Sequence, residues 1–554
     1  MTCIRRAVFL VLAVALVLSR PVAAQHEHAD AAAAAPQKPV LYDNLGTYHR
    51  AVTTGSPEAQ QFFDQGLRLL FAFNLEEAQH SFEEAARLDP SCAMCFWGAG
   101  MSLGPHINMA AQPDRTKAAN AAAQKAAALS AKGTPQERAL IAALTKRYSD
   151  PPPTDAAGQK ALDTAYADAM REVATRFPDD LDAAALYAEA MMNLRPWDLW
   201  TMDGRPQPGT EEILSTLERV MAKNPNHPGA NHYYIHAVEA SPHPERALAA
   251  AERMGSLEPG AAHLVHMPSH IYARVGRWED ASAVNRKAIA VDQSYLPMAG
   301  PLGFYFMYVA HNYQFLWSTS MMQGRSAEAL ANARAVVNQA PVEMLRQMPG
   351  FDFVLEYPIW TQVKFGRWQE ALAEPAPPAE FLYATAVWHA ARGLAFAGLG
   401  RLEDAEKELA ATKQTDAAQP ADAMAAFNSA HSLLSIAENM LAGEIAAKRG
   451  DMDEAVRRLE EATKTEDGLR YDEPPDWYVP VRHALGKALL AAGRGAEAQK
   501  VFEEDLRRHP ENGWSLHGLA ESLRLQKKDD AAARQRFAAA WKNADVKLSP
   551  PAGK

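Results

Sequence analysis

The sequence predicts an all-α protein in which helix–turn–helix repeats stack into an α-solenoid, or superhelix. The first observation is that small and aromatic residues recur with a 34-residue period along most of the chain. The second is that the segments between turns are rich in alanine, poor in β-branched residues and free of the alternating pattern of strands. The third is that the period breaks at proline-rich stretches, at 149–155, 374–380 and 471–480.

The N-terminal residues 1–24 have the pattern of a secretory signal peptide. Two arginines precede the apolar run Ala7–Leu18, and Val22 and Ala24 occupy the small-residue positions of a cleavage site. The apolar run is too short to span a membrane. The arginine pair raises twin-arginine export as an alternative, but the following residues favour the general secretory route. We therefore expect a periplasmic or secreted protein that begins with a flexible linker at 25–54.

The charge of the chain excludes some classes of partner. The formal net charge is −11, and the predicted signal contributes three arginines and no acidic residue, so the mature chain is more acidic still. An acidic chain argues against nucleic acid or an anionic membrane as the main partner. No later run approaches the length of a membrane span, which also argues against a membrane protein.

The mature chain keeps two cysteines, Cys92 and Cys95. In an oxidising compartment this spacing favours a local disulfide near the start of a helix. Thioredoxin-like redox chemistry is the alternative, but it needs a βαβ setting that the sequence does not show.

The repeat is clearest in "QGLRLLFAFNLEEAQHSFEEAARLDP". In a 34-residue unit that begins at Ala59, Gly66 takes position 8, Phe82 position 24 and Pro90 position 32. A unit counted from Val479 repeats this pattern, with Gly486, Ala498, Phe502 and Pro510. Further units carry a turn glycine with alanine five residues later, at Gly276, Gly324, Gly366, Gly400 and Gly450. The clear units lie near 59–92, 228–261, 262–295, 310–343, 352–385, 386–419, 436–469 and 479–512.

On these motifs the chain resembles the tetratricopeptide repeat family, in an exported bacterial form, over residues 55–546, with a short tail at 547–554. The resemblance implies a right-handed superhelix of helix pairs. It also implies that the first helix of each pair lines a concave face through positions 2, 5, 9, 12 and 13 of the unit.

Histidines concentrate in two adjacent units. Seven of the eighteen histidines lie between His227 and His270. "HYYIH" and "HMPSH" place a pair of histidines four residues apart at positions 5 and 9 of consecutive units, 34 residues from each other. A spacing of four residues puts both imidazoles of a pair on one face of a helix. His227 and His243 fall near predicted helix ends, and we expect capping or surface roles for them.

The resemblance places these histidines on the concave face, and neighbouring helix axes are about 8–10 Å apart, so the imidazoles can converge. The predicted metal ligands are His232, His236, Glu239, His263, His266, His270 and His311. Zinc, copper and iron all accept this ligand set. Hydrogen bonding to a peptide or an acidic ligand without metal is the alternative. Glu239 is expected to act as ligand or as base beside a metal-bound water.

Pro268 stands where the family usually has a large aliphatic residue. Proline inside a helix removes a backbone hydrogen bond and kinks the helix, which predicts that His266 is re-aimed relative to His270.

Other residues are expected to line the same groove as ligand contacts, with repeat packing or a solvated face as the alternative. They are Trp97, His106, Asn193, Trp197, Tyr233, Tyr272 and Glu356.

Two functions follow from the sequence. The first is a binding module whose concave groove holds a protein, a peptide or a small ligand, helped by a transition metal. The alternative is a metal-dependent enzyme, a hydrolase or an oxidoreductase, built on the repeat scaffold. The pattern "HYYIH" lacks the glutamate of a zinc-protease motif, so the sequence names no catalytic residue.

Overall fold

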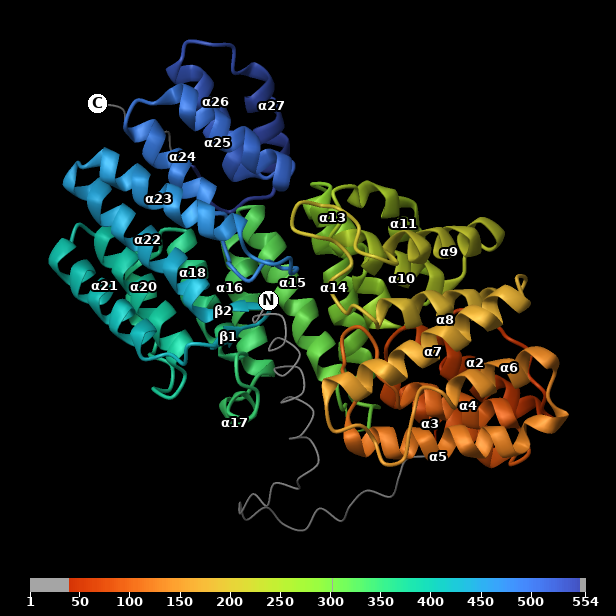
Figure 1. Ribbon diagram of the computed structural model, residues 1–554. Helices are drawn as coiled ribbons and strands as arrows, with labels where there is room; N and C mark the ends of the chain where they lie inside the picture. Colours follow the sequence, from red (N-terminus) through yellow and green to blue (C-terminus); the bar gives the residue numbers. More distant parts are fainter. Residues whose placement is uncertain (1–38, 301, 549–554) are drawn as a thin grey trace. The chain divides into compact units, whose positions relative to one another are not determined.

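The computed structural model describes residues 39–300 and 302–548, and within them the chain is almost entirely helical (Figure 1). The predicted all-α class is therefore confirmed. The predicted signal peptide at 1–24 lies outside the described residues. Within the described part of the chain, no helix has both the length and the apolar character needed to cross a bilayer.

The chain divides into two compact units, each described here by itself. The first contains the residues up to Ile271 together with Lys287–Val309, and the second contains Tyr272–Arg286 and the residues from Ala310 onward. The boundaries between the units fall within α13 (Pro268–Arg274), α14 (Trp278–Tyr295) and α15 (Tyr305–Met322).

In the first half of the chain, consecutive helices pack on one another in sequence order. Their bounds are α2 Pro57–Phe71, α3 Leu75–Leu88, α4 Ala93–Ser102, α5 Pro113–Leu129, η1 Ser130–Lys132, α6 Pro135–Leu144, α7 Ala156–Arg176, α8 Leu181–Met192, α9 Thr210–Lys223, α10 Pro228–Glu239, η2 Pro244–Ala247, α11 Leu248–Leu257, α12 Ala262–His266, α13 Pro268–Arg274 and α14 Trp278–Tyr295.

In the second half the same pairing of neighbours continues. The bounds are α15 Tyr305–Met322, α16 Ser326–Gln339, α17 Val342–Leu345, η3 Asp352–Glu356, α18 Tyr357–Lys364, α19 Trp368–Ala373, α20 Leu382–Gly398, α21 Leu402–Ala417, β1 Met424–Ala425, β2 Asn428–Ser429, α22 Ala430–Arg449, α23 Met452–Asp467, α24 Val481–Ala491, α25 Gly495–Arg508, α26 Gly513–Leu525 and α27 Ala531–Ala540. The two short strands form one antiparallel hairpin.

The small and aromatic repeat positions pack as the sequence predicts. The ring of Phe82 on α3 is fully buried between α2 and α4. A Cβ added at Gly66 would lie 2.8 Å from this ring, and one added at Gly98 would lie 2.2 Å from it. Since real side chains do not approach so closely, glycine at both positions is what lets the aromatic ring enter.

The predicted turn glycines have the left-handed backbone that ends a helix. Gly276, Gly324, Gly366, Gly400 and Gly450 all have φ between 69° and 84°. Residues with a Cβ are disfavoured in this region, so glycine sets the turn between the two helices of a pair.

The part of the linker expected at 25–54 that the structure describes makes long-range contacts. Leu45 is buried, and the hydroxyl of Tyr48 donates a hydrogen bond to Asp182 on α8 over 2.7 Å. Arg50 binds Asp182 and the N-cap residue Asp180, both within 2.8 Å. Composition cannot show these contacts, because they join residues 130 or more positions apart.

We expect the Asp182 carboxylate to stabilise the first unit in a pH-dependent way. Burial raises its pKa, but hydrogen bonds and charge from His227 and Arg50 outweigh burial and hold the pKa well below the ordinary 3.8. Because the folded-state pKa is the lower one, this contribution is complete above about pH 4 and is lost as the pH falls further. Asp182→Asn should lower the unfolding free energy by about 3 kcal/mol at pH 7.

Urea unfolding of both proteins at pH 7 and pH 3 measures this effect. The difference between wild type and variant should shrink at pH 3, and a difference that stays constant would contradict the assignment.

Cys92 and Cys95 form a disulfide at the start of α4, the outcome favoured from their spacing. The sulfur of Cys92 also accepts a hydrogen bond from the backbone N–H of Cys95, so Cys92 acts as the N-cap.

Candidate metal centre

The first half of the site comes from α10, which presents two histidines and a glutamate on one face. His227 is the N-cap, since its Nδ1 accepts a hydrogen bond from the N–H of Ala230, and Pro228 opens the helix where no intrahelical N–H bond is lost. His232, His236 and Glu239 follow one helical turn apart, and all three are buried. The predicted capping role of His227 is confirmed, and His243 is exposed on the surface as expected.

The second half comes from a helix that is interrupted at its proline. Helix α12 ends at His266, and α13 begins at Pro268, with Met267 between them. The predicted break in the helix at Pro268 is confirmed. His263, His266 and His270 are all buried, on the two sides of this break.

Three imidazoles from the two halves converge. The ligand nitrogens of His232, His236 and His263 lie within 4.8 Å of one another. The Nε2 atoms of His232 and His263 are 3.2 Å apart. The predicted convergence of neighbouring first helices is therefore present for these residues.

The hydrogen bonds of the first two histidines fix which nitrogen carries a lone pair. Nδ1 of His232 lies 2.6 Å from the carbonyl oxygen of Phe71, and Nδ1 of His236 lies 2.9 Å from Oε1 of Glu239. A carbonyl or carboxylate oxygen only accepts, so each Nδ1 carries a proton, and in the neutral imidazole Nε2 presents its lone pair. Nε2 of His236 is buried and has no hydrogen-bond partner among the described residues.

The remaining two histidines contact each other and the same glutamate. Nδ1 of His270 lies 2.7 Å from Oε2 of Glu239. Nε2 of His270 lies 2.8 Å from Nε2 of His266 and forms a hydrogen bond with it. Nδ1 of His266 lies 3.4 Å from the hydroxyl of Ser269. Glu239 thus supports one histidine with each of its oxygens.

The protonation states suit metal binding near neutral pH. Burial, assisted by the nearby His236, lowers the pKa of His232 well below its ordinary value, so this imidazole is neutral. Burial raises the pKa of Glu239, but the charges and hydrogen bonds of His270 and His236 outweigh burial and lower it to about 2. The site therefore combines the neutral imidazole of His232 with the ionised carboxylate of Glu239.

Aromatic rings pack against two of the three converging histidines, His232 and His263. The ring of Phe73 lies 4.6 Å from that of His232 and 5.9 Å from that of His263, measured between centroids. Tyr308 covers His263 at 4.2 Å. Phe73 has a φ of 56°, a strained conformation for a residue with a Cβ, and such strain concentrates at functional sites.

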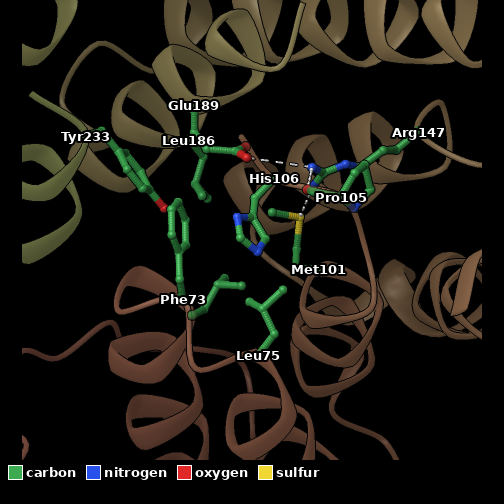
Figure 2. A pocket seen from close by; sticks show the side chains of 10 residues that line it. Phe73, Leu75, Met101, Pro105, His106, Arg147, Leu186, Glu189 and Tyr233 are labelled. Atoms are coloured by element: carbon green, nitrogen blue, oxygen red, sulfur yellow. Dashed lines mark hydrogen bonds and ion pairs between the residues drawn. The ribbon is translucent and has the colours of Figure 1, made fainter. Parts of the chain in front are cut away.

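On its other side, Phe73 stacks at 4.2 Å on His106, which lines a small adjoining pocket (Figure 2). Figure 2 shows His106 between Phe73 and the Arg147–Glu189 ion pair, whose closest atoms are 3.7 Å apart. The free volume of the pocket is close to that of one water molecule, so it is too small for a peptide side chain. Burial lowers the pKa of His106 well below its ordinary value.

The other residues predicted as ligand contacts divide between the two units. In the first unit, Tyr233 lies beside Phe73, and Trp197 contacts the edge of His236 at 5.6 Å. Asn193 donates a hydrogen bond to Glu189, and Trp97 is buried in α4.

The rest belong to the second unit. Tyr272 stacks under Arg277, and Glu356 is buried at the end of η3. His311 is on α15, where its Nδ1 lies 2.9 Å from the side-chain oxygen of Gln314. Their part in a ligand site stays a prediction.

Sequence reasoning missed two participants in this centre. The carbonyl of Phe71 orients His232 although the two residues are 161 positions apart, and a backbone group leaves no residue-type signal. Phe73 is the second phenylalanine of "FAF" in the first repeat, but nothing in that repeat distinguishes it from an ordinary packing residue.

No protein-family model matches this chain, and no curated protein matches it. Among solved structures, it is similar to the Rap protein complexed with Competence and Sporulation Factor, at 13% identity and a TM-score of 0.36, over 69% of this chain and 94% of that one. It is also similar to the human IFIT1 dimer with m7Gppp-AAAA, at 13% identity and a TM-score of 0.30, over 89% and 91%.

A third similar structure is the APC/C hetero-tetramer Cut9-Hcn1, at 13% identity and a TM-score of 0.28, over 88% of this chain and 74% of that one. At these TM-scores the similarity does not bear on what this chain binds. The fold class rests on the chain's own stacked helices.

Proposed function

We propose that this protein binds one transition-metal ion through Nε2 of His232, His236 and His263. The observation that carries the proposal is the Nε2 atom of His236. It is buried, it presents a lone pair and it has no hydrogen-bond partner among the described residues. An unsatisfied buried acceptor is costly, and a bound cation removes that cost.

The spacing of the nitrogens supports the same proposal. Two imidazole nitrogens bound to one zinc ion at tetrahedral angles are about 3.4 Å apart, since each metal–nitrogen bond is about 2.0–2.1 Å. The 3.2 Å between His232 and His263 is close to this value. A ligand held by hydrogen bonds alone would need the two nitrogens farther apart, because it must place atoms between them.

The imidazole ligands favour a transition-metal ion of intermediate softness. Imidazole suits zinc, copper, iron and nickel, and the nitrogen-rich set argues against magnesium or calcium. The contact from Glu239 to Nδ1 of His236 is the carboxylate–histidine–metal arrangement that holds a ligand ring in place and makes it more basic. We therefore assign Glu239 to support the ligands rather than to bind the ion.

Three protein ligands leave room for a fourth at a tetrahedral ion, and this favours an enzyme as a second candidate function. A metal-bound water would serve a hydrolase, and an open position at copper or iron would serve an oxidoreductase. Glu239 does not fit the role of general base, because each of its oxygens already lies within 2.9 Å of a histidine nitrogen.

The wider proposal is an exported binding module. Stacked helix pairs form extended surfaces that hold a protein, a peptide or a small molecule. The acidic net charge supports such ligands over nucleic acid, and the signal-peptide pattern supports a periplasmic or secreted location.

Cobalt(II) titration of the metal-free protein tests the metal site. We expect visible absorption bands of a nitrogen-bound cobalt ion that saturate at one equivalent and disappear when zinc is added. A spectrum that stays that of hydrated cobalt at several equivalents would overturn the proposal.

A further inference from the structure

A buried chain of charged and polar groups in the second unit lies outside the proposed metal centre. Asp505 on α25 is fully buried, and its Oδ2 is 3.0 Å from Nε2 of His483 on α24. Nδ1 of His483 is 2.8 Å from Nζ of Lys364, the last residue of α18. Three helices therefore join an aspartate, a histidine and a lysine in series.

The direction of the hydrogen bonds follows from the aspartate. Asp505 also accepts from Ser515, Asn512 and His509, and its interactions with His483 and His509 keep its pKa well below the ordinary value although burial raises it. The carboxylate is thus ionised and only accepts, so His483 donates through Nε2. Its Nδ1 then presents a lone pair to the amine of Lys364. A carboxylate, an imidazole and a nucleophile in this order is the arrangement of hydrolytic triads, with an amine in place of the hydroxyl.

A purely structural role for Lys364 is a poor explanation. A buried ammonium normally pairs with a carboxylate, but the partners of this amine are the His483 imidazole and the face of Trp514, with Nζ 4.0 Å from the ring centroid. Burial lowers the pKa of Lys364 to about 7, with Lys487 acting in the same direction and Asp505 against it. The residue as a whole is half-buried rather than fully enclosed.

We propose that Lys364 is a nucleophilic amine that condenses with an aldehyde or ketone to form an imine. The amine nitrogen attacks the carbonyl carbon while His483 accepts a proton from that nitrogen. His483 returns that proton to the carbonyl oxygen, which gives the carbinolamine. It then passes the second proton of the nitrogen to the new hydroxyl, which leaves as water when the C=N bond forms. One water is released for each imine, and no oxidant or reductant takes part. The indole of Trp514, fixed by its hydrogen bond to the Met321 carbonyl, places an apolar ring 4.0 Å from Nζ.

Reductive trapping tests the proposal on the full-length mature protein. The protein is incubated at pH 7.5 with benzaldehyde and sodium cyanoborohydride, and benzylation of each lysine is followed by peptide mass spectrometry. We expect Lys364 to react at least about tenfold faster than Lys487, an exposed lysine on α24, because the lowered pKa of Lys364 leaves more of its amine unprotonated at this pH. Equal rates at the two lysines would overturn the proposal.

Two further measurements test whether the reactivity of Lys364 depends on His483. His483→Gln keeps an amide at the Nε2 position for Asp505 but removes the acceptor for Lys364, so trapping should slow about tenfold while circular dichroism stays unchanged. Unchanged trapping in a folded variant would overturn the role of His483. The pH dependence of Lys364 trapping in wild type gives an independent readout, with an expected midpoint near 7 that reflects His483, Asp505, His509 and Lys487 around the amine. A midpoint above 9 would overturn the activated amine.

Discussion

His236→Ala should weaken zinc or cobalt binding by at least about 100-fold, because it removes a ligand and also frees one oxygen of Glu239. The lost nitrogen is the one that has no other partner among the described residues, so nothing nearby replaces it. Competition with a chromophoric chelator of known affinity measures the change.

His243→Ala is the matched control, since this histidine lies four residues beyond α10 and its side chain is 68% exposed. The metal affinity of the His243→Ala variant should equal that of the wild-type protein. If the two variants bind metal equally well, the ion is elsewhere or absent. Circular dichroism of both variants shows whether the fold is retained.

The second large effect concerns the repeat packing. Phe82→Ala should lower the free energy of unfolding by about 3–5 kcal/mol, because it empties the space between α2 and α4 that Gly66 and Gly98 leave for the ring. Gly66 and Gly98 cannot fill that space, so the cavity remains. Chemical denaturation followed by the fluorescence of the tryptophans measures the loss.

Leu525→Ala serves as the comparison, since this leucine at the end of α26 is 43% exposed. Its loss should stay below about 1 kcal/mol. A similarly small loss for Phe82→Ala would mean that the glycine–aromatic contact does not hold the helices together.

The repeat pattern predicted the fold class because its cause is local. Glycine at position 8 and phenylalanine at position 24 meet within one pair of helices, as Gly66 and Phe82 do, and the turn glycines act on their own backbone. The contacts of the segment at 39–54 could not be predicted, since Arg50 finds its partners about 130 residues away.

The site could be predicted in part for the same reason. The period of the repeat brings His232, His236 and His263 together, and it does not depend on the rest of the chain. The role of Glu239 could not be read from sequence, because ligand, base and support differ only in where its two oxygens point. The chain from Asp505 to Lys364 was missed because a lysine at the end of a helix normally lies in solvent.

The metal content of the purified mature protein tests the central proposal most directly. Elemental analysis after gel filtration in metal-free buffer should find close to one zinc, copper or iron ion per chain in wild type and almost none in a variant with both His236→Ala and His263→Ala. A wild-type protein that carries no transition metal, and takes none up when it is offered, would contradict a metal site at these histidines.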